Sequence, residues 1–189
     1  TLELGPQTDL EIQQKLRREV DQDRFTSLDR DIVRDADGRS LDLRQKPAHP
    51  YARFKHSLRM GRLRKLERMD LARETAPGVW TIAGDLEDRL RRIGERDDII
   101  KTLHREMARG GLDRSAGDYA IFDPGGAGGE KLVGRIVAVG LSDEIKDRHY
   151  VIVDGLDART YYVDIGQRRD TDDLPVGGII EIGVQPGEP

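Results

Sequence analysis

The sequence pattern changes near residues 110–117, and this change constrains the fold more than any other feature. Before it, apolar residues recur every three or four positions, which is the period of an amphipathic helix. After it, short runs of β-branched and aromatic residues alternate with Gly, Asp and Pro, which is typical of strands and turns. We therefore expect an α+β protein with a helical domain over residues 1–116 and a β domain over residues 117–189.

The expected helical domain ends in a pattern typical of a winged helix. We expect helices over residues 9–20, 27–33 and 52–70, a short strand over 39–44, and strands over 73–75 and 79–82. The last two strands flank Ala76-Pro77-Gly78, and Pro-Gly is a strong turn signal. A helix followed directly by a two-stranded hairpin is the winged-helix layout. A further helix over residues 85–109, with a kink or break near Gly94–Asp98, would bridge the two domains.

The expected β domain contains five short strands in about 70 residues. They cover residues 119–122, 132–139, 150–153, 160–165 and 179–182. This spacing predicts a small five-stranded β-barrel of the OB or SH3 type. Gly125–Gly129 is interpreted as a hairpin loop. It is not interpreted as a phosphate-binding loop, because no Lys-Ser/Thr follows it and it precedes a strand.

The charge of the chain is unevenly distributed. The sequence has 32 Lys+Arg and 36 Asp+Glu, a net charge of −4. Residues 1–50 carry 9 basic and 11 acidic residues (−2), residues 51–116 carry 16 and 11 (+5), and residues 117–189 carry 7 and 14 (−7). A positive field concentrated in one segment favours an anionic partner for that segment even when the whole chain is acidic.

The basic segment coincides with the helix expected over residues 52–70. Met60, Leu63, Leu66 and Met69 recur every third residue and predict a buried face. We interpret the intervening basic residues as an opposite, exposed face that contacts DNA phosphates or bases. The predicted DNA-binding residues are Arg59, Arg62, Arg64, Lys65, Arg68 and Arg73. A basic helix face can also be solvated surface, and winged helices also bind proteins, so both interpretations remain open.

The sequence offers no recognisable catalytic or metal site. It contains no cysteine, which excludes disulfides and thiolate ligands. Its four histidines form no pair at metal-ligand spacing, and Tyr161 and Tyr162 are interpreted as strand aromatics rather than nucleophiles. No run of about 20 apolar residues is present. We therefore expect a cytoplasmic, non-catalytic chain without a cofactor or a membrane partner, and its start at Thr1 predicts a fragment of a longer protein.

Several motifs along residues 2–182 resemble one known family. They are LGPQTDLEIQQKL, RFTSLDRDI, GRLRKLERMDLA with APGVWTI, LEDRLRRIGERDDIIKTLHR, and LVGRIVAVGLSDE with YVIVDGLDARTYYV. These segments resemble the carboxy-terminal region of bacterial relaxase/mobilization nucleases, which are related to the agrobacterial border endonuclease. The resemblance implies a parent that nicks one plasmid strand by transesterification and pilots it through a type IV secretion channel. In that family the nicking tyrosine and the histidine triad lie in an amino-terminal domain, so neither role is carried onto this chain.

Two functions from different classes follow from these observations. The first is an accessory module that binds DNA near the plasmid transfer origin through the basic helix and the wing. The second is a protein-recognition module, a translocation signal read by the type IV secretion coupling protein or by relaxosome partners. The acidic β domain favours the second function, because like charge repels the phosphate backbone. The resemblance makes a stand-alone winged-helix transcription regulator the weaker alternative.

Overall fold

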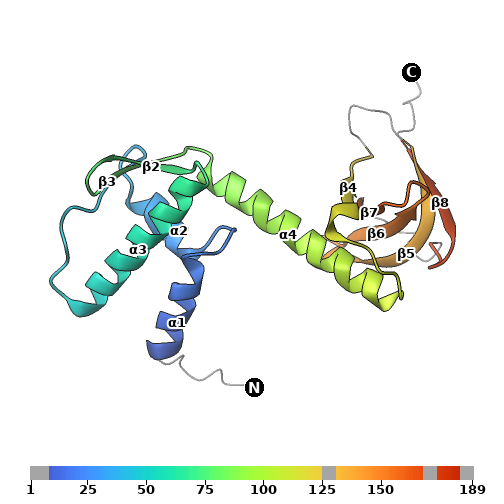
Figure 1. Cartoon of the computed structure of the whole chain (residues 1–189), viewed down its shortest axis with the longest axis horizontal. Coiled ribbons are helices and arrows are strands. Elements are labelled where there is room, and N and C mark those ends of the chain that lie inside the picture. The colour runs from blue at the N-terminus through green and yellow to red at the C-terminus, as the bar shows by residue number, and fades with distance from the viewer. Residues whose placement is uncertain (1–8, 125–130, 168–173, 184–189) are drawn as a thin grey trace. The chain divides into compact units, whose positions relative to one another are not determined.

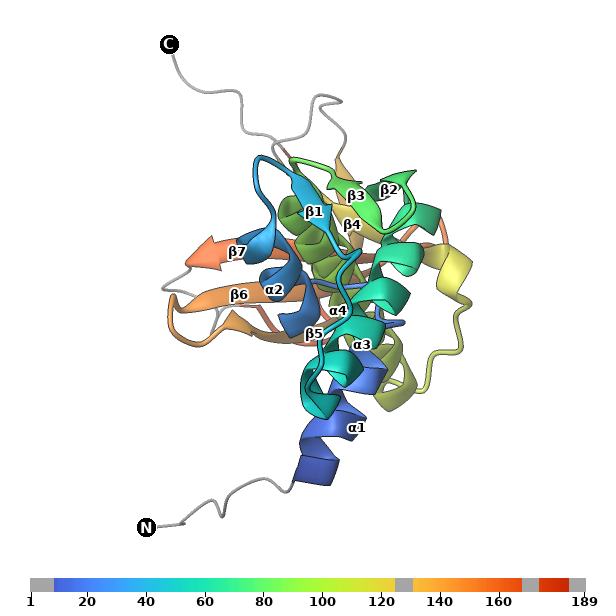
Figure 2. The ribbon, with the colours of Figure 1, turned by 90° about the vertical axis from the view of Figure 1, so that its left-hand side faces the viewer.

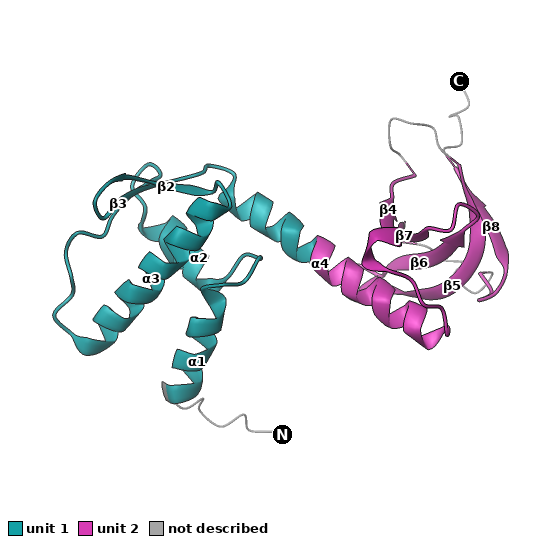
Figure 3. Cartoon of the chain, in the orientation of Figure 1, with its two compact units in different colours: residues 1–95 teal, residues 96–189 magenta. Residues whose placement is uncertain are grey.

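The chain forms two compact units, residues 1–95 (unit 1) and residues 96–189 (unit 2) (Figure 3). The computed structural model describes residues 9–124, 131–167 and 174–183 (Figure 1). Helix α4 (Leu86–Arg109) contains the division, so its first part belongs to unit 1 and its second part to unit 2. The change in sequence pattern near residues 110–117 lies after this division, because it marks the change from helix to strands and not the boundary between the two units. Within the described ranges, no helix combines the length and the apolar character needed to cross a membrane.

Unit 1 combines three helices, a three-stranded antiparallel sheet and the start of α4. Its elements are α1 (Asp9–Glu19), α2 (Ser27–Asp35), β1 (Ser40–Asp42), α3 (Pro50–Arg68), β2 (Ala72–Ala76) and β3 (Val79–Ile82). The strand order is β1-β3-β2, which places β3 at the centre (Figure 2). The predicted helices and the β2–β3 hairpin are confirmed. The hairpin turns at Pro77-Gly78, where Gly78 has a φ of 77°, a conformation that glycine adopts without steric cost.

The core of unit 1 forms where α3 and α4 meet the sheet. Trp80 of β3 is fully buried and belongs to one cluster with Leu63 and Leu66 of α3 and Leu90 of α4. The helix α4 runs without a break through Gly94–Asp98, where the sequence predicts a kink or break. Gly94 has a packing role instead, because a Cβ atom there would lie 3.0 Å from the Cβ of Arg24.

Unit 2 is a five-stranded mixed sheet with the second part of α4 on one face. Its elements are a 3₁₀ turn (Ala116–Asp118), β4 (Tyr119–Phe122), β5 (Leu132–Asp143), β6 (Arg148–Gly155), β7 (Thr160–Gln167) and β8 (Ile179–Ile182). Leu103 and Met107 of α4 pack against Tyr150, Ile152 and Tyr162. A second cluster, centred on the fully buried Val151, Val153 and Val163, lies on the other side of the same strands.

The prediction of a barrel in this region is wrong, although its five strands are confirmed. The strand order is β4-β7-β6-β5-β8, so β4 and β8 are the two edges, and they do not pair within the described residues. Strand β4 pairs in parallel with β7, from Tyr119↔Thr160 to Phe122↔Val163. The residues of the hairpin loop expected over Gly125–Gly129 lie outside the described ranges, and the strands on either side of them, β4 and β5, are not neighbours in the sheet. Strand propensity identifies extended segments but does not determine which of them pair.

Candidate nucleic-acid interface

Helix α3 positions most of the predicted DNA-binding residues, and both of its ends are fixed by capping. His49 precedes the helix, and its Nδ1 accepts a hydrogen bond from the Tyr51 N–H at 3.3 Å, while Pro50 occupies the first helical position. At the other end, the Leu71 N–H donates to the Leu66 carbonyl at 2.8 Å and the Asp70 N–H donates to the Glu67 carbonyl at 3.0 Å. These two bonds form a Schellman motif, which makes the position of the last turn well defined.

Three of the predicted residues are exposed and unpaired. Arg64 and Arg68 lie on the last turns of α3, and Arg73 lies on β2 beside it. None of the three forms an ion pair or a side-chain hydrogen bond with another described residue. A guanidinium group in this state keeps all five of its N–H donors available to water or to an anionic ligand.

A fourth exposed arginine, Arg53, lies near the start of α3 and is not among the residues predicted from the sequence. With about 100° per residue, Arg53, Arg64 and Arg68 fall within about 60° of one another around the helix axis. Arg53 likewise has no ion pair with a described residue. We call Arg53, Arg64 and Arg68 the basic stripe. The signal that could have identified Arg53 is its spacing of 11 and 15 residues from the other two, close to three and four helical turns.

Arg59 and Lys65 are held by acidic neighbours. The Arg59 guanidinium lies 2.8 Å from the Asp35 carboxylate and 3.2 Å from the Asp31 carbonyl oxygen, and its side chain is 17% exposed. The Lys65 ammonium group lies 2.7 Å from the Asp23 carboxylate, and its side chain is 21% exposed. Each of these cations would have to exchange a carboxylate for a phosphate in order to bind DNA. They therefore contribute less free positive charge than the basic stripe.

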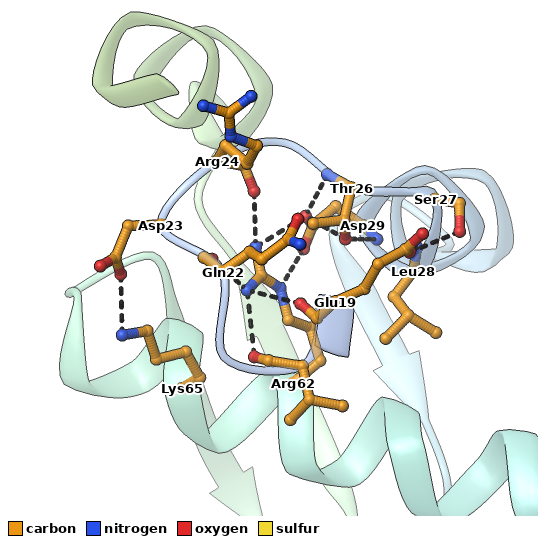
Figure 4. A network of polar contacts seen from close by, with 11 residues as sticks. Glu19, Gln22, Asp23, Arg24, Thr26, Ser27, Leu28, Asp29, Arg62 and Lys65 are labelled. Atoms are coloured by element: carbon orange, nitrogen blue, oxygen red, sulfur yellow. Dashed lines mark hydrogen bonds and ion pairs between the residues drawn. The ribbon is translucent and has the colours of Figure 1, made fainter. Parts of the chain in front are cut away.

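The prediction that Arg62 lies on an exposed face is wrong, because its side chain is 0% exposed. Its guanidinium group points toward Asp29 and the α1–α2 connection (Figure 4). Its Nε and Nη2 donate to the two carboxylate oxygens of Asp29, both at 2.8 Å. The remaining donors bind backbone carbonyl oxygens of the α1–α2 connection, those of Glu19, Val20, Gln22 and Arg24, at 2.6–3.2 Å. All five guanidinium N–H groups therefore have an acceptor, and Arg62 serves unit 1 as a buried structural residue.

The Asp29 carboxylate connects Arg62 to the start of α2. Thr26 is the N-cap residue, and both its backbone N–H and its hydroxyl donate to the Asp29 Oδ2 at 2.8 Å. Glu19 supports the same connection, since its Oε2 accepts hydrogen bonds from the Ser27 hydroxyl at 2.5 Å and the Leu28 N–H at 3.2 Å. One buried ion pair thus fixes the connection from Glu19 to Thr26 against α3.

The β2–β3 hairpin has a mixed charge. Beside Arg73 it carries Glu74, whose Oε1 accepts a hydrogen bond from the Gly78 N–H at 2.8 Å. The Glu67 Oε1 of α3 in turn accepts one from the Glu74 N–H at 3.2 Å. These carboxylates stabilise the hairpin and its junction with α3, but they reduce the positive potential there. The positive potential of this surface is therefore expected to be greatest along the basic stripe.

The two strand tyrosines considered as nucleophiles have environments that favour the neutral phenol. The Tyr161 hydroxyl donates to the Asp157 carboxylate at 2.5 Å, and this hydrogen bond raises the pKa of Tyr161 and lowers that of Asp157. Burial raises the pKa of Tyr162, whose ring stacks on Tyr150 with centroids 5.0 Å apart. Among the described residues, no three His, Asp or Glu side chains are grouped closely enough to hold a metal ion.

Comparison with known proteins identifies a family but not an activity. Residues 59–189 match the family described as "Protein of unknown function (DUF3363)". No curated protein and no solved structure matches the chain. The family match begins within α3, covers the β2–β3 hairpin and extends through the whole of unit 2. Because it covers more than half of the sequence, this chain belongs to the DUF3363 family.

Proposed function

We propose that this chain is a DNA-binding module from the carboxy-terminal region of a conjugative relaxase, and that it contacts DNA near the transfer origin. The observation that carries the proposal is the basic stripe, three exposed arginines on one helix face with no ion pair to a described residue. Arginine binds phosphate and guanine through two parallel hydrogen bonds, which makes it well suited to such a surface.

The arrangement of unit 1 supports contact through α3. The three-stranded sheet has the order β1-β3-β2, and its β2–β3 hairpin directly follows α3, which is the helix-and-hairpin layout expected of a winged helix. The buried side of α3 carries Leu63 and Leu66, so the basic stripe faces away from the core. A helix fixed on one side by its core and basic on the other can enter a major groove without rearrangement of unit 1.

The resemblance to relaxases supplies the biological setting of the proposal. A relaxase acts at one plasmid locus, and an accessory DNA contact outside its nicking domain would hold the enzyme on the origin. In this role the module needs affinity for the duplex and no catalytic group of its own. The parent protein, not this chain, performs the strand transfer.

The proposal is tested by the salt dependence of DNA binding. Fluorescence anisotropy of the whole chain with a labelled origin duplex is measured across a series of salt concentrations. Log K should fall against log salt with a slope of about −0.9 per phosphate contacted. The variant Arg64→Ala/Arg68→Ala should bind more weakly and show a slope smaller by about two phosphate contacts.

A charge-matched control separates contact from general attraction. Arg34→Ala/Arg44→Ala removes the same charge from two exposed arginines that are paired with acidic neighbours, Asp31 and Asp35 for Arg34 and Asp42 for Arg44. The control should bind almost as tightly as the wild type. Equal loss of affinity in both double variants, or absence of duplex binding by the wild type, contradicts the proposed contact surface.

Unit 2 favours a second candidate function, recognition by a protein. Residues 117–189 carry a net charge of −7, counted as 7 basic and 14 acidic residues. Among the described residues of this unit, the three most exposed large aliphatic residues are Ile145 at 96%, Leu156 at 81% and Ile179 at 73%. Exposed aliphatic groups on an acidic unit suit a protein surface better than a phosphate backbone. The partner would be the type IV secretion coupling protein or another relaxosome component.

This second candidate is tested with the whole chain and purified coupling protein. Leu156→Asp should weaken the complex, because it places a charge where an apolar contact is expected. Val33→Asp, at an exposed aliphatic residue of unit 1, is the matched control and should leave the complex unchanged. Absence of binding by the wild type, or an equal effect of both variants, counts against recognition through unit 2.

A further inference from the structure

Aromatic side chains gather at the amino end of α3, next to α1. An open hollow of about 630 Å³ is lined there by Gln13 of α1 and by His49, Pro50, Tyr51 and Phe54. The hollow belongs entirely to unit 1 and lies apart from the core formed by the sheet.

The two rings of the hollow are placed for stacking rather than for core packing. Tyr51 is 45% exposed, although tyrosine is a large side chain that usually buries most of its surface. The ring centroids of Tyr51 and Phe54 lie 6.5 Å apart, with an angle of 36° between the rings. Neither residue belongs to the buried cluster of unit 1. Their exposed ring surface is therefore available to a flat partner.

A positive charge lies against this aromatic surface. The guanidinium carbon of Arg17, on α1, lies 5.5 Å from the centroid of the Phe54 ring, within cation–π distance. Arg17 is exposed and makes no ion pair or hydrogen bond with another described side chain. The hollow thus has aromatic faces with one arginine, Arg17, beside them, and Arg17 has no described anionic partner.

We propose that this hollow stacks an unpaired nucleobase, so that unit 1 recognises a junction between duplex and single-stranded DNA. The inference rests on the proposed function and specifies its ligand. Arg17 favours a base attached to phosphates over an apolar peptide, because an apolar peptide would leave this cation without a counter-charge. Aromatic rings beside arginine are the usual means by which proteins bind single strands without reading their sequence.

The length of α3 fits a junction. Arg53 and Arg68 are 15 residues apart, which at about 1.5 Å per residue places them about 22 Å apart along the helix. At about 3.4 Å per base step, this distance corresponds to roughly six or seven steps. Where α3 runs along the DNA, duplex phosphates contacted by Arg64 and Arg68 would thus lie about six or seven base steps from a base stacked on Tyr51.

The test compares three DNA ligands of the whole chain by fluorescence anisotropy. They are a 20-base-pair duplex, the same duplex with a six-nucleotide single-stranded tail, and the tailed duplex with an abasic first unpaired nucleotide. The tail should increase affinity by about 5- to 150-fold, the range for one base stacked on an aromatic ring. The abasic tail keeps the phosphate but lacks the ring, so it should lose most of this gain.

Two variants assign the gain to the hollow. Tyr51→Ala should remove the preference for the tail and leave duplex affinity within about twofold, whereas Tyr51→Phe, which keeps the ring, should retain the preference. In the wild type, 2-aminopurine at the first unpaired position should be quenched on binding, and Tyr51→Ala should reduce this quenching. Circular dichroism of both variants verifies that the chain is folded.

The outcomes separate this inference from the proposed function. Salt-dependent duplex binding with no gain from the tail would overturn the stacking site and leave the duplex contact intact. The same holds for a gain that persists in Tyr51→Ala or with the abasic tail. If the chain binds neither the duplex nor the tailed duplex, both the proposed function and the stacking site are refuted.

Discussion

Replacement of Arg62 by leucine should destabilise unit 1 severely. The substitution leaves the Asp29 carboxylate, itself 0% exposed, without its cation. Loss of one partner of a buried ion pair costs about 3–5 kcal/mol. The carbonyl groups of the α1–α2 connection also lose their donors, although those of Val20, Gln22 and Arg24 are only partly buried and can be rehydrated. A cost of about 3–5 kcal/mol is a large share of the roughly 5–15 kcal/mol that stabilises a typical domain.

The single tryptophan of the chain makes this effect measurable in unit 1 alone. Trp80 is fully buried in the core of unit 1, so its fluorescence during heating reports the thermal unfolding of that unit. For a domain of 60–100 residues, about 1 kcal/mol shifts the melting temperature by roughly 4–8 °C. Arg62→Leu should therefore lower the transition of Trp80 by at least about 12 °C, or abolish it.

Two further variants separate the contributions of charge and geometry. Arg62→Lys keeps the charge but has no planar fork to bind Asp29 and the carbonyls together, so it should also be clearly less stable than the wild type. Arg64→Leu, two residues away and exposed, should change stability by no more than about 0.5 kcal/mol. If Arg62→Leu unfolds within about 0.5 kcal/mol of the wild type, the structural role assigned to this buried arginine is wrong.

Three smaller perturbations test other parts of the structure. Asp70 has a φ of 58°, a conformation that glycine adopts with less strain than aspartate. Asp70→Gly should therefore stabilise unit 1 by about 1 kcal/mol and raise the midpoint of its urea unfolding. An unchanged midpoint would contradict the strain at this position. Hydrogen bonds from the Arg44 side chain and backbone lower the pKa of Asp42 to about 2. An NMR titration of the carboxyl groups should give a pKa of about 2 for Asp42 in the wild type and a value nearer 3.8 in Arg44→Ala. Because folding lowers this pKa, the ionised Asp42 stabilises the folded state above pH 4, and this contribution is lost as the pH falls from about 4 to 2. Titration of Asp42 near 4 in the wild type would refute its pairing with Arg44. In β5, a Cβ atom at Gly134 would lie 2.6 Å from a Val153 methyl group. Gly134→Ala should therefore lower the free energy of unfolding of unit 2 by about 1–3 kcal/mol, measured by denaturation followed by near-UV circular dichroism. Gly117→Ala, where the new Cβ atom would have no contact under 3.8 Å, should leave this free energy unchanged.

Helix periodicity is sufficient to place Arg62 on the buried side of α3. With about 100° per residue counted from Met60, the apolar residues Leu63, Leu66 and Met69 lie at about 300°, 240° and 180°. Arg62 lies at about 200°, between Leu66 and Met69, and thus inside the apolar arc, close to its edge. Periodicity correctly predicted which side of α3 is buried. What it could not supply is the partner, because Asp29 lies 33 residues earlier in the chain.

Pairing between distant segments limited the other predictions in the same way. The strands of unit 2 were located by local composition, but the parallel pairing of β4 with β7 depends on long-range packing. The side-chain partners of Arg59 and Lys65 likewise come from α2 and from the α1–α2 connection, which helix periodicity does not reveal. Arg64, Arg68 and Arg73 were predicted as exposed correctly because their positions depend only on the local helix and hairpin.

The parallel pairing of β4 also determines the order in which unit 2 can be built. Strand β4 precedes β5 in the chain, yet its partner in the sheet is β7, from Tyr119↔Thr160 onward. During synthesis β4 therefore leaves the ribosome before any strand with which it can pair. It must wait until β7 has formed its antiparallel hairpin with β6. Closing such a long loop delays the contact, so we expect β4 to join after β5, β6 and β7 have paired, and its backbone amides to gain protection from hydrogen exchange later than those of these three strands.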